Sequence, residues 1–460
     1  MSTKKVLLNK SGDPREKKEF YKLVFALVLP MALQNLINVG VSSADVIMLG
    51  KVGETALSAS SLANQIQFIM SLFFFGLTSG ASVLTAQYWG KQDVTTIEKI
   101  FGMAMSIALI VGAIFTVAAL LFPASLMSIF TNEQDIIEQG VIYLRIIALS
   151  YIITAITSVY LNIMRSVERV IISTIVYLIS LAVNVILNYI LIFGKLGFDP
   201  MGIKGAAIAT LIARTIELLI VFIYHKFYNK LLRFRIKDLF LWDKLLIKDF
   251  LTYTVPVMLN ELVWGGGTAA NAAIIGHLGK SVVAANSVTQ VTRQLAMVVA
   301  FGLSNATAII LGKAIGEEKY DKAKLYAKRF VRISIILGII GAFIILGVSQ
   351  VAGSFLSLST EAESYLKFMM FVMSYFALGQ SFNATLVVGV FRAGGDTKFG
   401  LIIDAATLWG CSIFLGYLAA FVFKLPIPIV YVLLMSDEII KLPFTYKRYK
   451  SMKWLKNITR

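Results

Sequence analysis

The stretch Phe75–Gly90, FGLTSGASVLTAQYWG, recurs in the second half of the chain as Phe301–Gly316, FGLSNATAIILGKAIG. Both copies begin with Phe-Gly-Leu and end with glycine. The offset that carries position 75 to position 301 also aligns Pro30 with Pro256, Ala44 with Ala270, Gly50 with Gly276, Gly53 with Gly279, Ala59 with Ala285 and Ser61 with Ser287. A single offset that holds over about 60 residues predicts an internal duplication, in which each half of the chain builds the same helical unit. We call it the repeat offset.

The composition places both units in a lipid bilayer. Hydrophobic residues make up 58% of the 460 residues and charged residues only 15%, whereas soluble domains average about 45–50% and about 25%. The excess lies in long runs such as Ile107–Leu121 and Ile333–Val348. The sequence therefore predicts an all-α, polytopic membrane protein.

Apolar runs long enough to cross a bilayer occur twelve times in the sequence, because a spanning helix needs about 20 apolar residues. They lie at 22–48, 57–87, 99–123, 138–163, 170–194, 202–225, 249–276, 283–311, 326–350, 362–390, 399–422 and 426–446. Six runs fall in each unit, and an even number gives both units the same orientation. We therefore expect two parallel six-helix repeats related by an axis along the membrane normal.

Basic residues mark one face of the predicted bundle. The segments 1–22, 226–248, 313–332 and 441–460 each contain seven Lys or Arg residues. The segment 123–142, on the opposite face, contains none. Because basic loops stay on the cytoplasmic side, we expect both termini in the cytoplasm of a bacterium and the spans in its inner membrane.

This pattern divides the chain into predicted parts. They are a basic N-terminus at 1–21, an N-lobe at 22–225, a basic linker at 226–248, a C-lobe at 249–446 and a basic tail at 447–460. Apolar residues are interspersed among the basic residues of the linker, which predicts a helix that lies on the inner leaflet. These loops explain the net charge of +17, so we expect membrane lipid but no nucleic acid as a partner.

Motifs of enzymes and of nucleotide-driven pumps are missing from the sequence. It contains no Walker loop and no GxGxxG, HExxH or GxSxG motif. His225 and His277 lie near opposite ends of predicted helices and Cys411 lies in an apolar run, so they form no metal-ligand cluster. We therefore expect neither enzymatic activity nor a cofactor, and a transporter without a nucleotide site must draw on an ion gradient.

Several stretches resemble the multidrug and toxic compound extrusion (MATE) family. In the first half they are Pro30–Asn35, Ser43–Asp45 with Leu49–Gly50, Gly76–Gly90, Asn184–Tyr189, and Gly202 with Gly205–Ala207. In the second half they are Pro256 with Glu261, and Arg392–Thr397. Together they cover nearly the whole chain in the family's order. The resemblance implies a V-shaped bundle of two lobes that exports organic cations against the entry of Na⁺ or H⁺.

Asp45 is the first candidate for coupling export to an ion. A carboxylate at bilayer depth costs about 2.5–3.5 kcal/mol, and the equivalent position in the other repeat is Asn271. Asn184 and Asn188 lie four residues apart on one helical face, and with Asp45 they would supply oxygen ligands for Na⁺. Asp45 alone suits H⁺, and part of the family carries a carboxylate where this chain has Asn188, so both ions stay open. Packing roles for the three side chains are the alternative.

Glu261 is the second candidate, because its repeat equivalent carries no charge. The resemblance implies a role in cation coupling, since NorM-like members of the family have an acid on this helix. Those members also place a carboxylate in the tenth helix, where this chain has Tyr375, Gln380 and Asn383. We expect these three residues, together with Asp45 and Glu261, to contact the substrate.

Other charges within the predicted spans have simpler explanations. Arg214 and Glu217, three residues apart, are expected to form a structural salt bridge. Arg293 has no local partner and could neutralise Glu261 or another acid. Asp404 lies near the inner end of its helix and could reach the membrane interface.

Positions for gating and bending also follow from the sequence. Arg392 and Asp396 flank a Gly-Gly pair, where they could form a cytoplasmic gate or simply pair within the loop. Proline and consecutive glycines both weaken a helix. We therefore expect bending at Pro30 and Pro256, and at Gly265, Gly266 and Gly267.

The predicted function is secondary active multidrug export by alternating access, with organic cations leaving in exchange for Na⁺ or H⁺. The alternative is a flippase for a lipid-linked sugar or precursor, which shares this architecture but needs a strongly cationic cavity. The basic residues within the predicted spans are few, mainly Arg145, Arg214 and Arg293, which disfavours a flippase. A two-lobed carrier forms its pathway alone, so we expect a monomer.

Overall fold

The structure is a computed structural model that describes residues 14–232, 239, 242–355 and 359–460. All regular secondary structure in these ranges is helical, which confirms the predicted all-α class. The surface helix predicted for the linker falls largely on residues 233–238 and 240–241, which lie outside the described ranges.

The first repeat forms the N-lobe. Its helices are α1 (Pro14–Val52), α2 (Glu54–Gly90), α3 (Val94–Leu121), α4 (Pro123–Ser128), α5 (Gln134–Ile147), α6 (Leu149–Ser166), α7 (Ile171–Phe193), α8 (Gly202–Ile223) and the π-helical turn η1 (Tyr224–Tyr228). Helices α5 and α6 meet at an angle of 48° and together occupy the fourth predicted span.

The second repeat forms the C-lobe. Its helices are α9 (Lys244–Gly276), α10 (Lys280–Gly316), α11 (Tyr320–Phe355), α12 (Thr360–Ala384), η3 (Thr385–Phe391), α13 (Thr397–Asp404), η4 (Ala405–Ile413), α14 (Phe414–Tyr417), η5 (Leu418–Val422), α15 (Ile427–Leu434) and α16 (Asp437–Lys450). The tenth and eleventh predicted spans therefore contain π-helical segments, η3 and η4 among them.

The chain is a multi-pass membrane protein. In the described part of the chain, nine helices are long and apolar enough to cross a membrane, and the bent pair of α5 and α6 makes a tenth. The two remaining predicted spans lie on α9, which has 33 residues, and on α15 with α16, which have 8 and 14 residues. Each of the twelve predicted spans thus falls on helix.

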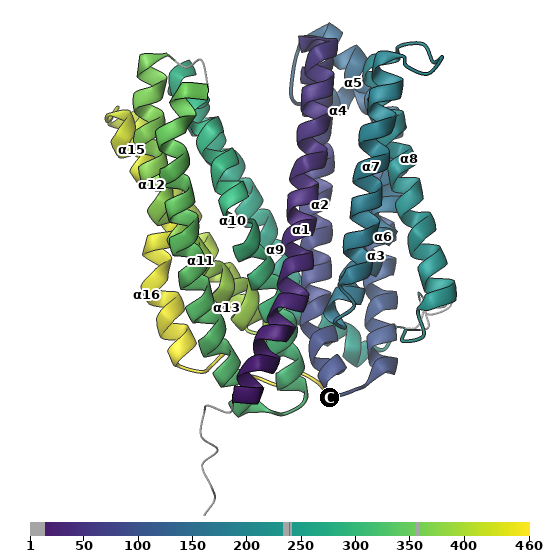
Figure 1. The fold of residues 1–460 in the computed structure, drawn as a ribbon, viewed down its shortest axis with the longest axis vertical. Helices are drawn as coiled ribbons and strands as arrows, with labels where there is room; N and C mark the ends of the chain where they lie inside the picture. The colour runs from purple at the N-terminus through teal and green to yellow at the C-terminus, as the bar shows by residue number, and fades with distance from the viewer. Residues whose placement is uncertain (1–13, 233–238, 240–241, 356–358) are drawn as a thin grey trace, which may run out of the picture.

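The two lobes form a V (Figure 1). They lie against each other at one end of the molecule and diverge toward the other. The C-terminus lies at the end where the lobes meet, which we call the closed end. Helix α1 starts at the closed end and rises into the N-lobe, where α2 and α7 lie beside it.

Helices α1 and α9 each begin in the core of the opposite lobe. Phe20 of α1 is fully buried in a C-lobe cluster, with its ring 5.1 Å from that of Phe330. In the same way, Phe250 of α9 is buried in the N-lobe cluster. Each helix then continues into its own lobe, where α1 contacts α7 and α9 contacts α13. Pro30 and Pro256 therefore lie along the part of each helix that crosses between the lobes.

The contact surface between the lobes, which we call the seam, is symmetric. A Cβ atom added at Gly76 would lie 2.6 Å from the Cα atom of Met258, and one added at Gly302 would lie 3.1 Å from the backbone nitrogen of Ala32. The repeat offset relates Gly76 to Gly302 and also Ala32 to Met258. The duplication read from the sequence is therefore a pseudo-twofold relation across the seam.

The C-terminal segment crosses the seam at the closed end. Trp454 is fully buried in the C-lobe cluster, and Ile458 packs in the N-lobe cluster. The side chain of Gln87 in α2 donates to the carbonyl oxygen of Lys456 at 3.0 Å and accepts from the backbone N–H of Ile458 at 2.8 Å. The segment thus fastens the two lobes together.

Ion pairs also stabilise the closed end. Lys313 of α10 and Glu168 of the N-lobe lie 2.5 Å apart, with both side chains partly buried. Arg460 contacts Asp249 through two hydrogen bonds of 2.7 and 2.9 Å. The pair of Lys313 and Glu168 joins the lobes directly, because each lobe supplies one residue.

Candidate functional site

A cavity of about 380 Å³ lies at the seam, mostly within the C-lobe. We call it the central cavity. Its walls come from α1 and α2 of the N-lobe and from α9, α10, α12, η3, α13 and α16 of the C-lobe. Phe75, Trp264 and Phe301 supply aromatic surface, while Glu261 and Arg392 supply charge. Aromatic faces beside a carboxylate suit an amphiphilic organic cation.

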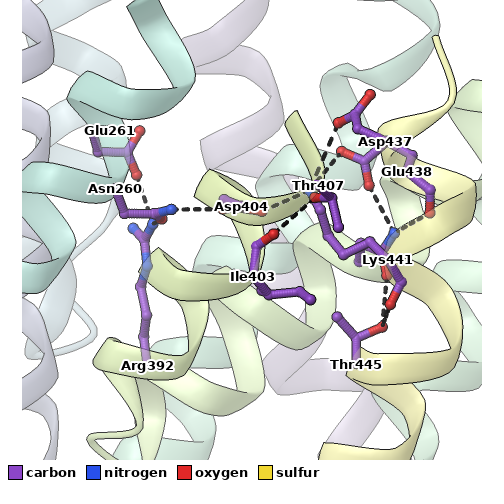
Figure 2. Close-up of polar contacts among 11 residues, drawn as sticks. Asn260, Glu261, Arg392, Ile403, Asp404, Thr407, Asp437, Glu438, Lys441 and Thr445 are labelled. Carbon is purple, nitrogen blue, oxygen red and sulfur yellow. Dashed lines mark hydrogen bonds and ion pairs between the residues drawn. The ribbon is translucent and has the colours of Figure 1, made fainter. Parts of the chain in front are cut away.

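Glu261 and Arg392 form a buried ion pair on the cavity wall. Their closest atoms are 2.7 Å apart, and the side chains are only 10% and 4% exposed. The same guanidinium donates to Asn260 at 2.8 Å and, across the seam, to Ser79 at 2.8 Å. Asn260 in turn donates to Asp404 at 2.6 Å, which joins the pair to further charges (Figure 2).

Lys441 of α16 is the centre of those further charges. Its ammonium group lies 2.6 Å from Asp404, 3.4 Å from Glu438 and 3.9 Å from Asp437 (Figure 2). Asn383 donates to Glu438 at 2.7 Å. All five side chains are buried. We call this set, together with Asn260, Glu261 and Arg392, the C-lobe network.

The C-lobe network contains more acids than bases. Its four acids are Glu261, Asp404, Asp437 and Glu438, and its two bases are Arg392 and Lys441. Excess negative charge in a buried site is costly unless a cation or a proton joins it. The network is therefore suited to taking up a cation from the cavity.

Arg293 does not neutralise Glu261, which was one expectation from the sequence. Its guanidinium donates to the amide oxygens of Gln290 at 3.0 Å and Gln380 at 2.9 Å, while Arg392 pairs with Glu261. Sequence spacing could not reveal this, because Arg392 follows Glu261 by 131 residues.

Asp45, Asn184 and Asn188 meet within the N-lobe. The amide of Asn188 donates to Asp45 at 2.5 Å and to Asn184 at 3.1 Å, and Asn184 donates to Thr210 at 3.2 Å. The carbonyl oxygen of the Asn188 side chain is buried and receives no hydrogen bond from the described residues. A carboxylate beside an unused buried oxygen could accept either a proton or Na⁺.

No metal-binding cluster of acids, cysteines or histidines appears in the described ranges, because no three such residues form a suitable group there. A Na⁺ ion near Asp45 would therefore take its other ligands from amide and hydroxyl oxygens. Asn184, Asn188 and Thr210 are the side chains in position to supply them.

The residues expected to contact the substrate divide into two groups. Glu261, Gln380 and Asn383 line the central cavity. Tyr375 and Asp45 lie outside its lining, so their contact with a substrate stays a prediction. Gln380 and Asn383 also hold Arg293 and Glu438 in place.

Two expectations about charged residues turn out differently. Asp404 does not reach the membrane interface but is buried, 8% exposed, between Asn260 and Lys441. Arg214 and Glu217, in contrast, pair as predicted, with their closest atoms 2.7 Å apart.

One expectation from the sequence was that Arg392 and Asp396 pair within their loop. In the structure they do not. Asp396 instead accepts two hydrogen bonds from Arg448, at 2.6 and 2.8 Å. The Gly-Gly turn directs Arg392 toward Glu261 and Ser79, and Asp396 toward α16. The hydrogen bond from Arg392 to Ser79 crosses the seam. A gating role for Arg392 would use this contact and stays a prediction.

The residues expected to bend lie within continuous helices. Pro30 is inside α1, and Pro256 and the glycines 265–267 are inside α9. Cβ atoms added at the first and third of these glycines would overlap the side chains of Leu72 and Leu408. The glycines therefore allow close packing here, and bending at them stays a prediction.

Several residues of the site were missed by the sequence reasoning, among them Asn260, Asp437 and Glu438 of the C-lobe network. Lys441 was counted only among the basic residues of the segment 441–460, although it is 5% exposed in the C-lobe network. Arg165, at the end of α6, was not considered, and it lines a smaller pocket of about 40 Å³ beside the central cavity. The repeat offset carries Arg165 to Phe391, one position short of Arg392, so extending the comparison of the repeats would have placed the two arginines at adjacent positions.

Two pseudo-symmetric lobes in a membrane, with a charged cavity at the seam, are typical of a transporter built from parallel repeats. The sequence profile of the MatE family matches residues 30–190 and 256–418, one segment in each repeat. The chain therefore belongs to the MatE family of transporters.

Curated relatives agree with this assignment. The chain is 23% identical over 455 residues to a probable multidrug resistance protein, YoeA, of Bacillus subtilis, and the match covers 97% of both chains. It is 24% identical over 442 residues to a probable multidrug resistance protein, NorM, of Synechocystis, covering 89% of both chains. These relatives match the chain over almost its whole length.

Solved structures of MATE proteins share the fold. A MATE protein in a bent conformation superimposes with a TM-score of 0.82 at 20% identity, covering 96% of this chain and 97% of the other. An outward-facing multidrug resistance MATE transporter gives a TM-score of 0.83 at 21% identity, with 96% and 97% covered. The twelve-helix fold predicted from the sequence is therefore confirmed.

Proposed function

We propose that this chain is a cation-coupled exporter of organic cations in the inner membrane of a bacterium, with both termini in the cytoplasm. The observation that carries this proposal is the C-lobe network, in which four buried carboxylates face two bases beside an aromatic cavity. An organic cation would be held there by Glu261 and by the aromatic faces of Trp264 and Phe301.

In this proposal, the basic loops determine which end of the V faces the cytoplasm. The closed end carries the C-terminal segment and its lysines and arginines, so it would face the cytoplasm. The lobes would then diverge toward the outside, in the state that releases cargo. Closing the outer end and opening the closed end would return the cavity to the cytoplasm.

Exchange of ion and cargo would supply the driving force. A proton or Na⁺ that enters from outside would bind a carboxylate and remove the countercharge of the organic cation. Each ligand then lowers the affinity for the other, and this differential affinity shifts the balance between the two states. Asp45, with the unused oxygen of Asn188 beside it, is the proposed ion site of the N-lobe, and Glu261 that of the C-lobe.

Reconstitution in liposomes tests the proposal. Efflux of a fluorescent organic cation is measured under an imposed Na⁺ gradient and, separately, an imposed H⁺ gradient. We expect one gradient to accelerate efflux in the wild type. Asp45→Asn and Glu261→Gln are then compared, and the variant that falls to the rate seen without a gradient identifies the coupling lobe.

A matched control is Asp135→Asn, because Asp135 is an exposed acid in the first turn of α5. We expect this variant to transport like the wild type. If neither gradient drives efflux of any organic cation tested, the exporter proposal fails.

One observation favours a second candidate, the flippase for a lipid-linked precursor. Arg165 and Arg392 both line the smaller pocket at the seam, and such a flippase needs basic residues for a pyrophosphate. The acids of the C-lobe network oppose this candidate, since they would repel a dianion. Assay of a fluorescent lipid-linked diphosphate in the same liposomes separates the two functions.

A further inference from the structure

Arg165 and Arg392 share a pocket at the seam. The pocket has a volume of about 40 Å³ and is lined by both residues. Phe75, Asn305, Val388 and Arg392 line both this pocket and the central cavity. The two spaces therefore adjoin each other, so that Arg165 lies beside the central cavity.

The two arginines occupy equivalent positions in the repeats. Their separation is the repeat offset plus a single position, and each ends the fourth span of its repeat. The carbonyl oxygen of Arg165 accepts from the backbone N–H of Glu168 at 3.0 Å, and that of Arg392 accepts from Gly395 at 2.9 Å. Glu168 and Gly395 both have a positive φ, 64° and 74°, so the same turn follows each arginine.

Their amide partners are equivalent as well. Arg392 donates to the side-chain oxygen of Asn260 at 2.8 Å, and Arg165 donates to that of Gln34 at 3.2 Å. Gln34 and Asn260 are themselves related by the repeat offset. The arrangement of one arginine and one amide is thus present in both lobes.

The acid is present in one lobe only. Glu261 neutralises Arg392, but its equivalent in the first repeat is Asn35. Arg165 donates to Asn162 at 2.5 Å, and its Nε atom is buried without a hydrogen-bond partner. Within the described ranges, no carboxylate oxygen lies within 4.0 Å of its guanidinium.

The guanidinium of Arg165, which has no carboxylate partner in the described ranges, would be stabilised by binding an anion. Arginine keeps its charge in proteins, so the group cannot lower the cost of burial by losing a proton. A buried charge without a counter-charge is strongly unfavourable. The Nε–H of Arg165 therefore lacks an acceptor, which a ligand that carries negative charge would supply.

We propose that Arg165 forms an oxyanion subsite, and that the cargo is a zwitterion whose carboxylate binds there. The cationic, aromatic part of the cargo would occupy the central cavity beside Glu261. A guanidinium binds a carboxylate through two parallel hydrogen bonds, and the hydroxyl groups of Ser79 and Ser82 line the same pocket. The proposal rests on the proposed export function for the cationic part of the cargo.

The size of the pocket favours a single small group. Its volume of about 40 Å³ is above the roughly 10–15 Å³ that a cavity needs to hold one water molecule. A carboxylate could enter it while the body of the ligand stays in the central cavity of about 380 Å³.

Two dyes that differ in one group test the subsite. Rhodamine 110 carries a free carboxylate beside its cationic ring system, and rhodamine 123 is its methyl ester. Binding of each dye to purified protein in detergent is measured by fluorescence anisotropy, without any ion gradient. We expect the wild type to bind rhodamine 110 more tightly, roughly tenfold, because a hydrogen bond to a charged group contributes that much or more.

Arg165→Gln should remove this preference. Affinity for rhodamine 110 should fall roughly tenfold, whereas affinity for rhodamine 123 should change less than about twofold. Arg165→Lys keeps the charge but loses the planar pair of donors, so it should retain part of the preference. Arg145→Gln is the matched control, because Arg145 is exposed on α5, and it should bind both dyes like the wild type.

Asn35→Glu offers a second variant that leaves Arg165 in place. The new carboxylate would occupy the position equivalent to Glu261 and neutralise Arg165, so the preference for rhodamine 110 should disappear. Equal losses for both dyes in Arg165→Gln, or an unchanged preference in both variants, would overturn the subsite. Ion-driven efflux of rhodamine 123 could still be normal in that case, so failure of the subsite and failure of the export function are distinguishable.

Discussion

Gly316 of α10 lies directly against the carbonyl oxygen of Gln87 in α2, where an added Cβ atom would overlap that oxygen. The equivalent contact exists on the other side of the pseudo-twofold relation, where a Cβ at Gly90 would overlap the carbonyl oxygen of Lys313. Gln87 and Lys313 are themselves related by the repeat offset. The closed end is therefore built twice from one backbone contact that only glycine permits.

Gly316→Ala should weaken the closed end. The added methyl group cannot fit against a backbone oxygen, and overpacking of this kind typically costs about 1–3 kcal/mol. We expect a lower midpoint of thermal unfolding in detergent. Gly276→Ala is the control, because no atom lies within 4 Å of its added Cβ and alanine is the better helix former. Equal stability of the two variants would contradict the proposed packing.

Ile458→Ala should loosen the bridge that the C-terminal segment makes across the seam. Ile458 is 9% exposed within the N-lobe cluster, and truncating a buried isoleucine costs about 2–5 kcal/mol. Local opening of the closed end should therefore become more frequent. The rate at which an impermeant maleimide labels a cysteine placed at Ser82, in a Cys411→Ser background, measures this opening.

The control for that experiment is Lys456→Ala. Its side chain is exposed, and the substitution keeps the carbonyl oxygen that accepts from Gln87. Labelling at the wild-type rate is expected for this variant. Labelling of Ile458→Ala at the same slow rate would show that the segment does not hold the lobes together.

Much of this architecture could be predicted from the sequence, because it follows from local properties. Apolar length located the twelve spans, and the offset between Phe75–Gly90 and Phe301–Gly316 gave the symmetry. The same offset also relates the glycines that make equivalent contacts in the seam, such as Gly76 and Gly302. The pairing of Arg214 with Glu217 was equally accessible, because three residues on a helix bring two side chains together.

The partners of the buried charges could not be predicted, because they depend on contacts between distant helices. Arg392 reaches Glu261 across 131 residues of sequence, and Lys441 reaches Asp404 from another helix. For the same reason, the sequence does not show that α1 and α9 each begin in the core of the opposite lobe. An apolar face shows that Phe20 is buried but does not show that it is buried in the other lobe.

Glu261→Gln should destabilise the protein by leaving Arg392 without a counter-charge. Breaking a buried pair in this way costs about 3–5 kcal/mol. The double variant Glu261→Gln with Arg392→Met removes both charges and should recover much of that loss. A double-mutant cycle on the free energy of unfolding in detergent gives the coupling between the two residues. Purely additive losses would mean that the ion pair contributes little.

Lys441→Met should be as damaging as the loss of Glu261. It leaves Asp404, Asp437 and Glu438 buried without the ammonium group that they share. We expect a loss of stability of about 3–5 kcal/mol, measured as a shift of thermal unfolding. Lys367→Met is the control, because Lys367 pairs with Glu363 on the surface, with side chains 57% and 40% exposed, and such pairs contribute about 0–1 kcal/mol.

The geometry also ranks the substitutions that should rescue Lys441→Met. Asp404 lies closest to the ammonium group, at 2.6 Å, whereas Glu438 and Asp437 lie at 3.4 and 3.9 Å. Asp404→Asn should therefore restore more stability than Asp437→Asn, since it removes the charge that Lys441 compensates most directly. It also leaves a side-chain oxygen that can accept from Asn260. Better rescue by Asp437→Asn would show that Lys441 mainly stabilises the start of α16. Its contribution to the chain of contacts that leads to Glu261 would then be the smaller one.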